Sequence, residues 1–258
     1  MYSACFLNGG FMQNEEQRTA RRFEELARRA FDRGFYTFTD FLNLDEQSTL
    51  LKLRLPSQVR LFGGFAFAER QMACFYDGAP PAGSDFPLTC LKIAPAAQKF
   101  AEALTHRDFL GALMGLGLKR ETLGDIVLFE KDAYLFCAEN MAGYIADNLR
   151  EVRRTNVMCT PGELPSGAVC EPKEKEVIVP SLRADALIAA VFHLSRSEVK
   201  TLFAQKKVFI NSRLCENSAQ ALKENDVVSL RGHGRFIFSE TLKTTKKDRL
   251  VAEIKTFE

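Results

Sequence analysis

The sequence predicts an α+β fold divided into several compact units. Apolar residues recur at helical spacing near the N-terminus, short β-like runs broken by Gly and Pro occupy the middle, and two helices followed by a strand come after a Pro-rich segment. With 258 residues, 46% of them hydrophobic, the chain can bury a real core in more than one unit. We expect an N-terminal helical segment over 1–56, a central domain over 57–160, a linker over 161–180, a small basic unit over 181–240 and a basic tail over 241–258.

The N-terminal segment predicts two helices. In NEEQRTARRFEELARRAFDRG, Asn14 can cap a helix that Gly34 ends. The core face of this helix is predicted to hold Phe23, Leu26, Ala27, Ala30 and Phe31. The opposite face interleaves arginines with glutamates, and a solvated helix face and a secondary RNA contact are its two interpretations. A second helix is expected after a cap at Thr39 or Asp40.

The central region predicts one sheet with two helices. Its β-like runs begin at VRLFGGFAF (59–67) and end at TNVMC (155–159), and the charged turn Glu130, Lys131, Asp132 between two of them fits a hairpin. Helical spacing recurs in HRDFLGALMGLG and NMAGYIADNLREV. This order of elements favours an α/β or α+β domain of roughly a hundred residues over an all-helical or all-β unit.

Charge is distributed unevenly along the chain. The whole chain has 35 Lys and Arg against 33 Asp and Glu, a net charge of +2. Residues 181–258 contain 14 basic against 9 acidic residues, whereas residues 1–180 contain 21 against 24. Only the C-terminal part therefore has the excess of positive charge that a polyanion partner requires.

The cysteines and the N-terminus indicate a cytoplasmic protein. Seven cysteines are scattered without the close spacing of metal-ligand pairs, which favours reduced, buried thiols over disulfides or a zinc site. MYSACFLNGGFMQ lacks a basic region before its apolar residues, and no apolar run reaches the roughly 18 residues of a membrane span. We expect no membrane partner.

The segment TPGELPSGAVCEPKEKEVIVP, residues 160–180, is the expected domain boundary, because its four prolines cannot sustain a helix. Two helices and a strand follow in SLRADALIAAVFHLSRSEVKTLFAQKKVFINSR. Ser195 with Glu198 forms a capping box, so the second helix should begin at Arg196. The predicted core faces of the two helices are Leu187, Ile188, Val191 and Leu194 on the first and Val199, Leu202 and Phe203 on the second.

Positive charge gathers on this C-terminal segment. At about 100° per residue, Arg196, Lys200 and Lys207 fall within roughly 40° of one another around the second helix. Arg183 heads the first helix and Arg213 follows the strand, so several elements contribute cations to one small unit. Phosphate backbones bind such an arrangement of Lys and Arg through charge, without base specificity. The alternative interpretation is a solvated helix face.

Residues 182–236 resemble the small RNA-binding domain named after ribosomal protein S-four. The marks of that family appear here as Arg183-Ala184-Asp185, Ser195-Arg196, Lys200, Ile210-Asn211-Ser212 and Lys223-Glu224-Asn225-Asp226. Ser212 and Asn225 stand where Gly is usual; Asn tolerates a left-handed backbone, and Ser212 implies an altered turn. The resemblance implies that Arg183, Arg196, Lys200 and Lys207 face structured RNA.

Residues 106–157, together with the C-terminal position of the basic module and the RGHGRF string, are similar to the YlmH family of bacterial proteins. The resemblance implies an N-terminal helical segment, a central domain like an RNA-recognition motif and a C-terminal S-four-type domain. It also implies a non-enzymatic role on large ribosomal subunits obstructed by peptidyl-tRNA. An association with cell division is a further implication.

An RNA-modifying enzyme is the rival interpretation, because S-four-type modules often accompany catalytic domains. A pseudouridine synthase needs an Asp in a Gly-Arg-Leu-Asp setting; the nearest string is His106-Arg107-Asp108, where Asp108 is more simply a helix N-cap. The motifs of a tyrosyl-tRNA synthetase are absent. GLGLKR, residues 115–120, lacks the third glycine of a dinucleotide fingerprint and follows a helix, so we interpret it as a helix C-cap.

The basic module thus predicts an RNA-binding protein, and the resemblance to the YlmH family implies a bacterial protein whose partners are ribosomal RNA and the large ribosomal subunit, with peptidyl-tRNA as a further candidate. We expect no cofactor, no metal, no catalytic residue and no small-molecule substrate. A third interpretation makes the central domain a protein-interaction module and RNA only an anchor. The predicted RNA-binding residues are Lys119, Arg120, Arg183, Asp185, Ser195, Arg196, Lys200, Lys206, Lys207, Asn211, Arg213 and Arg235.

Overall fold

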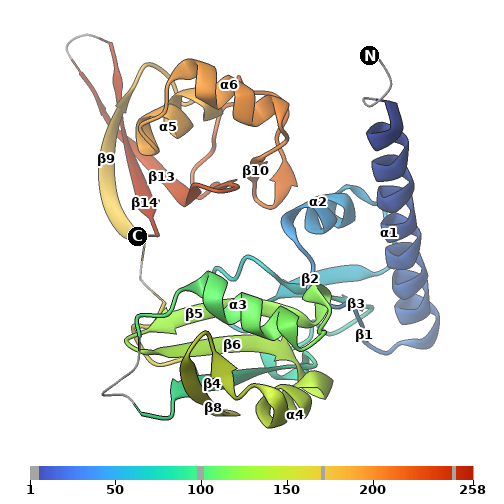
Figure 1. Cartoon of the computed structure of the whole chain (residues 1–258). Helices are drawn as coiled ribbons and strands as arrows, with labels where there is room; N and C mark the ends of the chain where they lie inside the picture. The colour runs from blue at the N-terminus through green and yellow to red at the C-terminus, as the bar shows by residue number, and fades with distance from the viewer. Residues whose placement is uncertain (1–5, 98–101, 170–171, 246–247, 258) are drawn as a thin grey trace. The chain divides into compact units, whose positions relative to one another are not determined.

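The computed structural model describes residues 6–97, 102–169, 172–245 and 248–257, with side chains from Glu16 onward. The chain forms two compact units, residues 1–169 and residues 170–258 (Figure 1). Both units combine helices with antiparallel sheets, so the α+β class predicted from the sequence is confirmed. Cys5 and Cys170 lie outside the described residues.

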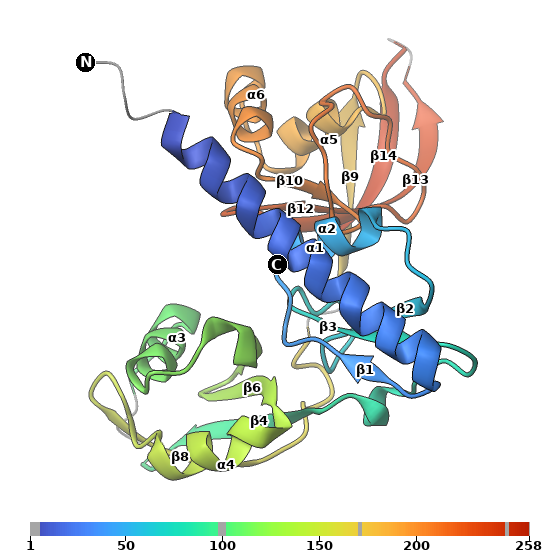
Figure 2. The same cartoon turned by 90° about the vertical axis from the view of Figure 1, so that its right-hand side faces the viewer.

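The first unit begins with a small sheet covered by two helices. Helix α1 lies across the β1–β3–β2 sheet (Figure 2), and Phe23, Ala27 and Ala30 of α1 pack with Phe75 and Ala73 of β3. These apolar side chains follow helical spacing on α1, so their burial fixes which face of the helix meets the sheet. The elements are α1 (Phe6–Arg33), β1 (Thr37–Phe38), α2 (Leu44–Lys52), β2 (Gln58–Phe62) and β3 (Met72–Tyr76).

Three details of the N-terminal prediction are wrong, and one is confirmed. Helix α1 already starts at Phe6, so Asn14 is not its cap; Gly34, with φ +67°, does end it. Phe31, predicted for the core, is 50% exposed. The cap of α2 is Asn43, whose Oδ1 accepts from the Asp45 and Glu46 amides. Thr39 instead accepts from the Ala73 amide at 2.9 Å.

The rest of the first unit is a five-stranded sheet in the order β5-β6-β4-β8-β7. Helices α3 and α4 both pack on one face, where Phe109, Leu113 and Ile145 meet Leu91 and Leu135. The chain order of the longer elements is the β-α-β-β-α-β pattern. Their bounds are η1 (Gly83–Asp85), β4 (Leu88–Pro95), α3 (His106–Gly115), η3 (Arg120–Thr122), β5 (Leu123–Phe129), β6 (Asp132–Ala138), α4 (Glu139–Asn148), β7 (Glu151–Val152) and β8 (Thr155–Pro161).

The central region thus contributes to two sheets, where one was expected. Strands β2 and β3 pair with each other, and β3 also pairs with β1 of the N-terminal segment. Local hydrophobic patterns could not reveal this division, because strand partners are chosen by tertiary packing. The predicted hairpin at Glu130 is confirmed, with φ +55° at that residue. The helix end at GLGLKR is also confirmed: α3 stops at Gly115, and Gly117 has φ +78°.

The second unit is a six-stranded antiparallel sheet with two helices on one face. The strand order is β11-β10-β12-β13-β14-β9, and α5 and α6 pack on it through Leu187, Ile188, Val199 and Phe203. The bounds are β9 (Lys173–Val179), α5 (Ala184–Val191), α6 (Arg196–Ala204), β10 (Val208–Ile210), β11 (Arg213–Leu214), β12 (Val227–Leu230), β13 (Gly234–Thr244) and β14 (Leu250–Thr256).

The expected linker and tail both supply strands to this sheet. Strand β9 lies inside the predicted linker and pairs along its whole length with β14 from the predicted frayed or helical tail. Strand β9 is a charged run, Lys173 to Glu176, followed by the apolar Val177 to Val179, and β14 carries charge only at Glu253 and Lys255; Val177, Ala252 and Ile254 reach the core. Neither segment therefore has the period of two over its whole length that indicates a half-buried strand.

In two tight turns, residues that stand in place of glycine adopt a left-handed backbone, as expected for Asn225. Asn211 and Ser212 have φ +50° and +61°, which makes the two-residue loop that joins β10 to β11. Asn225 is also left-handed, with φ +66°. Ser212 keeps the left-handed backbone that glycine would adopt, so the altered turn expected at this residue is not found.

Replacing Ile254 by Ala tests the contribution of β14 to the second core. We expect a loss of about 2–5 kcal/mol in the free energy of unfolding, because a fully buried side chain would leave a cavity. Lys255→Ala is the control, with an expected change below about 1 kcal/mol, since Lys255 forms only a surface ion pair with Glu174. Hydrogen exchange at the β9 and β13 amides measures the change in the free energy of unfolding for both variants. Equal protection of these amides in the two variants would contradict the assignment of the C-terminal tail to the core.

The five described cysteines are free, and burial raises the pKa of Cys74 and Cys137 to about 12 and of Cys90 and Cys159 to about 11, from a reference of 9.0. Because the folded pKa values exceed the reference, these thiols contribute stability that is present below pH 9 and is lost as the pH rises toward 11–12. We expect iodoacetamide to label them at pH 8 only in urea. Rapid labelling of the native protein, read by mass spectrometry, would contradict the burial.

Candidate nucleic-acid interface

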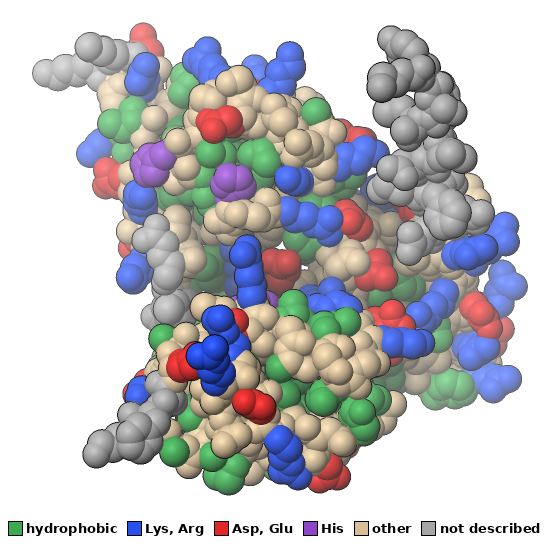
Figure 3. Space-filling view, in the orientation of Figure 1, with side chains coloured by type: hydrophobic (Ala, Val, Ile, Leu, Met, Phe, Trp, Pro, Cys, Tyr) green, Lys and Arg blue, Asp and Glu red, His purple; other side chains and the backbone are tan. Residues whose placement is uncertain are grey.

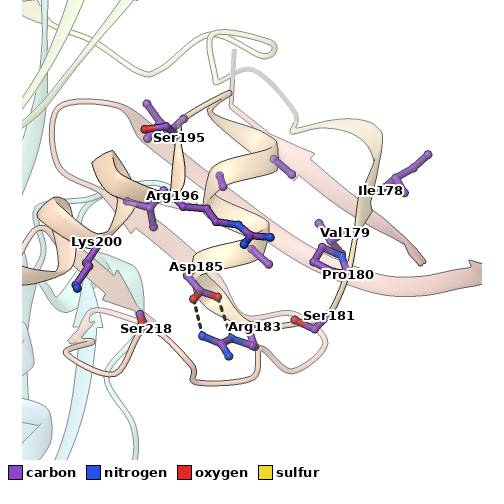
Figure 4. A pocket seen from close by; sticks show the side chains of 15 residues that line it. Ile178, Val179, Pro180, Ser181, Arg183, Asp185, Ser195, Arg196, Lys200 and Ser218 are labelled. Atoms are coloured by element: carbon purple, nitrogen blue, oxygen red, sulfur yellow. Dashed lines mark hydrogen bonds and ion pairs between the residues drawn. The ribbon is translucent and has the colours of Figure 1, made fainter. Parts of the chain in front are cut away.

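The second unit contains a groove of about 740 Å³ between its two helices and the end of β9 (Figure 4). Helix α5 forms the floor, the first turns of α6 form one side, and the chain leaving β9 forms another. Five predicted RNA-binding residues line this groove, namely Arg183, Asp185, Ser195, Arg196 and Lys200. The structure thus brings together residues up to 17 positions apart in the sequence.

Local signals position the charged residues of the groove. Ser195 is the N-cap of α6: its Oγ accepts from the Glu198 amide at 3.2 Å, and the Glu198 carboxylate accepts from the Ser195 amide at 2.7 Å. The predicted capping box is therefore confirmed, and it puts Arg196 in the first turn. Arg183 is the N-cap residue of α5. The Ser218 carbonyl accepts from the Asp185 amide at 3.1 Å, which holds the β11–β12 loop at this end of the groove.

The groove carries three cations and one carboxylate. Arg183 donates to Asp185 through Nη2 at 2.6 Å and Nε at 3.1 Å, and this hydrogen bonding raises the pKa of Arg183 above its ordinary value. Arg196 and Lys200 are exposed on the α6 side (Figure 4). On the visible face of the whole molecule, by contrast, basic and acidic side chains are interspersed (Figure 3). Positive charge therefore predominates on the concave surface of the groove.

The floor of the groove is apolar, and the sequence analysis missed it. Ala186, Ala189 and Ala190 of α5 line it together with Leu194 and Val199. The signal was present in ADALIAAV, which is apolar on almost every face although a helix on a single sheet needs only one apolar stripe. Ile178 to Pro180, assigned to the linker, form a wall together with Ser181, and no local pattern indicated this wall.

Two predicted lysines lie outside the groove. Helix α6 ends at Ala204, and Lys206 has φ +56°, so Lys207 is not on the helix and the predicted ridge with Arg196 and Lys200 is wrong at that position. The turn that leads into β10 breaks the helical periodicity on which the ridge was calculated. Lys206 forms an ion pair with Glu216 at 3.5 Å.

Three further predicted residues of the second unit also lie elsewhere. The Asn211 amide group donates to Asp226 at 2.7 Å and accepts from the Val227 amide, so it ties the β10–β11 turn to β12. Arg213 is exposed on β11, outside the groove lining. The Arg235 guanidinium lies 4.2 Å from the centre of the Phe257 ring; because its neighbour Phe236 is in the core below the helices, Arg235 lies on the opposite face of the sheet.

The two residues of the first unit that were predicted to contact RNA, Lys119 and Arg120, differ in their exposure. The Lys119 side chain is exposed, and its Nζ lies 3.9 Å from Oε1 of Glu121. Arg120 donates to the carbonyls of Leu123 and Gly124, and burial followed by the charge of Arg70 lowers its pKa to about 10. Arg120 is thus partly buried and hydrogen-bonded to the main chain, and its contact with RNA stays a prediction.

Comparison with known proteins identifies relatives of this chain. The family model described as "Putative RNA-binding domain in YlmH" matches residues 81–165. A Bacillus subtilis (strain 168) protein named "Ribosome-associated protein quality control protein P2" is 33% identical over 216 residues, which cover 82% of this chain and 83% of that relative. The chain belongs to the YlmH family. "Cell division protein ylmH from Streptococcus pneumoniae" aligns at 21% identity with a TM-score of 0.48, over 64% of this chain and 96% of that structure.

The matched segment of the YlmH family corresponds to the five-stranded sheet, whose helix-free face is partly covered. Phe136 on that face is 4% exposed and stacks on Phe65 at 5.0 Å. A Cβ at Gly64 would lie 2.2 Å from the Phe136 ring, so the N-terminal sheet segment approaches very closely. RNA-recognition motifs stack bases on exposed sheet aromatics. Phe136 and Tyr134 are both buried and cannot serve in this way.

The candidate carboxylate of the enzyme interpretation has a structural role. Asp108 is the third residue of α3 rather than its N-cap, and it accepts from the Thr105 amide at 2.8 Å and from the Thr105 hydroxyl at 2.7 Å. Thr105 thus takes the cap position predicted for Asp108. Across the described residues, no group of three or more His, Cys, Asp or Glu is arranged to hold a metal ion. None of the described helices has the length and apolar character of a membrane span.

The salt dependence of RNA binding tests the electrostatics of the groove. Three cations imply a slope of log affinity against log salt of about 2 to 3, below the roughly 3.5 to 4.5 that five contacts would give. Arg196→Ala and Lys200→Ala should each lower the slope by somewhat less than one unit. Lys223→Ala, an exposed lysine outside the groove lining, is the matched control. A salt slope unchanged by the two groove variants would contradict the assignment of the groove as the RNA-binding surface.

Proposed function

We propose that this protein binds ribosomal RNA of the large ribosomal subunit without chemical turnover and acts in the cytoplasm on subunits obstructed by peptidyl-tRNA. The groove between α5 and α6 is the RNA-binding surface of this proposal. The observation that carries it is the convergence of Arg183, Arg196 and Lys200 on one concave surface. Such a surface suits a phosphate backbone, which is recognised by several cations at fixed positions.

Membership of the YlmH family supports the ribosomal part of the proposal. The Bacillus subtilis relative is named for ribosome-associated protein quality control, and the matched family model is described as RNA-binding. Both names describe binding and quality control rather than a catalysed reaction. The use of Asp108 as a helix-capping residue further weakens a pseudouridine synthase interpretation.

The domain types are part of the same proposal. We assign residues 182–236 to the S-four type on the helix–helix–strand order and the Asn211–Ser212 turn. We assign the five-stranded sheet to an RRM-like arrangement on its β-α-β-β-α-β order. Because the aromatic side chains Phe136 and Tyr134 of this sheet are covered, the second unit is the main RNA contact.

Co-sedimentation with separated ribosomal subunits tests the proposed function. The wild-type protein should travel with the large subunit at low salt, and Arg196→Glu combined with Lys200→Glu should remove it, because the groove would change from net positive to net negative. Lys175→Glu combined with Lys223→Glu makes the same change in net charge at exposed positions outside the groove lining.

The control variant should sediment like the wild type, and circular dichroism should show that all three proteins are folded. Retention of the groove variant on the large subunit would contradict the proposed surface. Mass mapping of the RNA after incubation distinguishes the enzyme interpretation, because any modified nucleotide formed by the protein would contradict binding without turnover.

A further inference from the structure

We propose that the groove receives the base of an unpaired nucleotide, so that the preferred ligand is RNA with a bulged or looped-out residue rather than a continuous duplex. This inference rests on the proposed function, since it concerns the same groove. It adds the class of RNA structure that the groove selects.

The volume of the groove is comparable to that of a small-molecule site. Its volume of about 740 Å³ lies inside the range of about 300–1,000 Å³ that is typical of ligand pockets. A duplex backbone is convex and would contact only the rim of such a concavity. An unpaired base can enter it, because unpaired nucleotides leave the stack and expose their faces.

The chemistry of the lining changes from the rim to the floor. Arg196 and Lys200 are on the exposed α6 side, whereas the floor is formed by methyl groups of Ala186, Ala189 and Ala190. A phosphate placed against these alanines would lose its hydration without gaining a partner. The apolar face of a base gains from the same environment, and the Arg196 guanidinium offers a plane on which it can stack.

Asp185 is the second indication of base recognition. A carboxylate in a cationic groove opposes phosphate binding, yet Asp185 lines the groove beside its partner Arg183. Carboxylates recognise nucleic acids by accepting hydrogen bonds from base amino groups, as Asp and Glu do with cytosine. The paired Arg183 and Asp185 side chains can therefore present one donor group and one acceptor group to the same nucleotide.

Three synthetic RNA hairpins of one sequence test the inference. The first is fully paired, the second has one bulged adenosine, and the third has an abasic residue at the bulge, which keeps the phosphate and the flexibility of the second. The wild-type protein should bind the bulged hairpin about 5- to 150-fold more tightly than the abasic one, which is the range for stacking of one base.

Filling the floor of the groove tests the location. Ala189→Leu adds apolar volume without a change in charge, so it should abolish the preference for the bulge while leaving the salt dependence unchanged. Ala204→Leu is the matched control, because Ala204 is an exposed alanine on α6 outside the groove lining. Circular dichroism checks folding, and Ala186→Leu replaces Ala189→Leu if the latter does not fold.

The outcomes separate this inference from the proposed function. Equal affinity for the bulged and abasic hairpins overturns the inference and leaves RNA binding by the groove intact. A bulge preference that Ala189→Leu does not change overturns the placement of the base on this floor. Failure to bind any of the three hairpins or the large subunit overturns the proposed function, and the inference with it.

Discussion

The packing of α5 and α6 against one sheet is the constraint on which the proposed site depends. Leu187 and Ile188 of α5 and Val199 and Phe203 of α6 share a core with the sheet, so neither helix can rotate without exposing them. This fixes the outer face of α5 beside the first turns of α6. The capping box of Ser195 and Glu198 then sets the residue at which α6 begins, and with it the position of Arg196. The groove lies on the outer side of the two helices, and the burial of their inner apolar faces holds it in place.

In the proposed RNA interface, the charge of the groove and its shape have different roles. The three cations of the lining are few compared with the number of basic residues on the chain, and one of them is paired with Asp185. Electrostatic attraction of that size supports modest, salt-sensitive binding. In the proposed interface, selection among RNA structures is assigned to the concave apolar floor. This combination is suited to a protein that recognises a particular conformation of a large RNA.

The first unit contains the β-α-β-β-α-β order of elements, and the helix-free face of its sheet is partly covered. Its five-stranded sheet has two helices on one face, as the sequence suggested, but the other face meets the N-terminal strands through Phe136 and Phe65. Arg70 and Arg120 reinforce this junction by donating to main-chain carbonyls of Phe41 and Leu123. The buried aromatic face explains why the small basic unit, rather than this sheet, provides the better candidate for RNA contact.

The sequence by itself determined those features that depend on neighbouring residues. It predicted the start of α6 through the Ser195 capping box, the end of α1 at Gly34 and the core faces of α5 and α6, because caps and helical periodicity act over only a few positions. Leu194 is the exception: it was predicted for the core face of α5 but lies beyond the end of that helix and lines the groove. Tertiary structure alone decided which strands pair and that the end of β9 forms one side of the groove. Strand β9 joins β14 across more than 70 residues, and the wall at Ile178 exists only through that pairing. Such contacts leave no local pattern, since a strand gains its stability from whichever partner covers its edge and face.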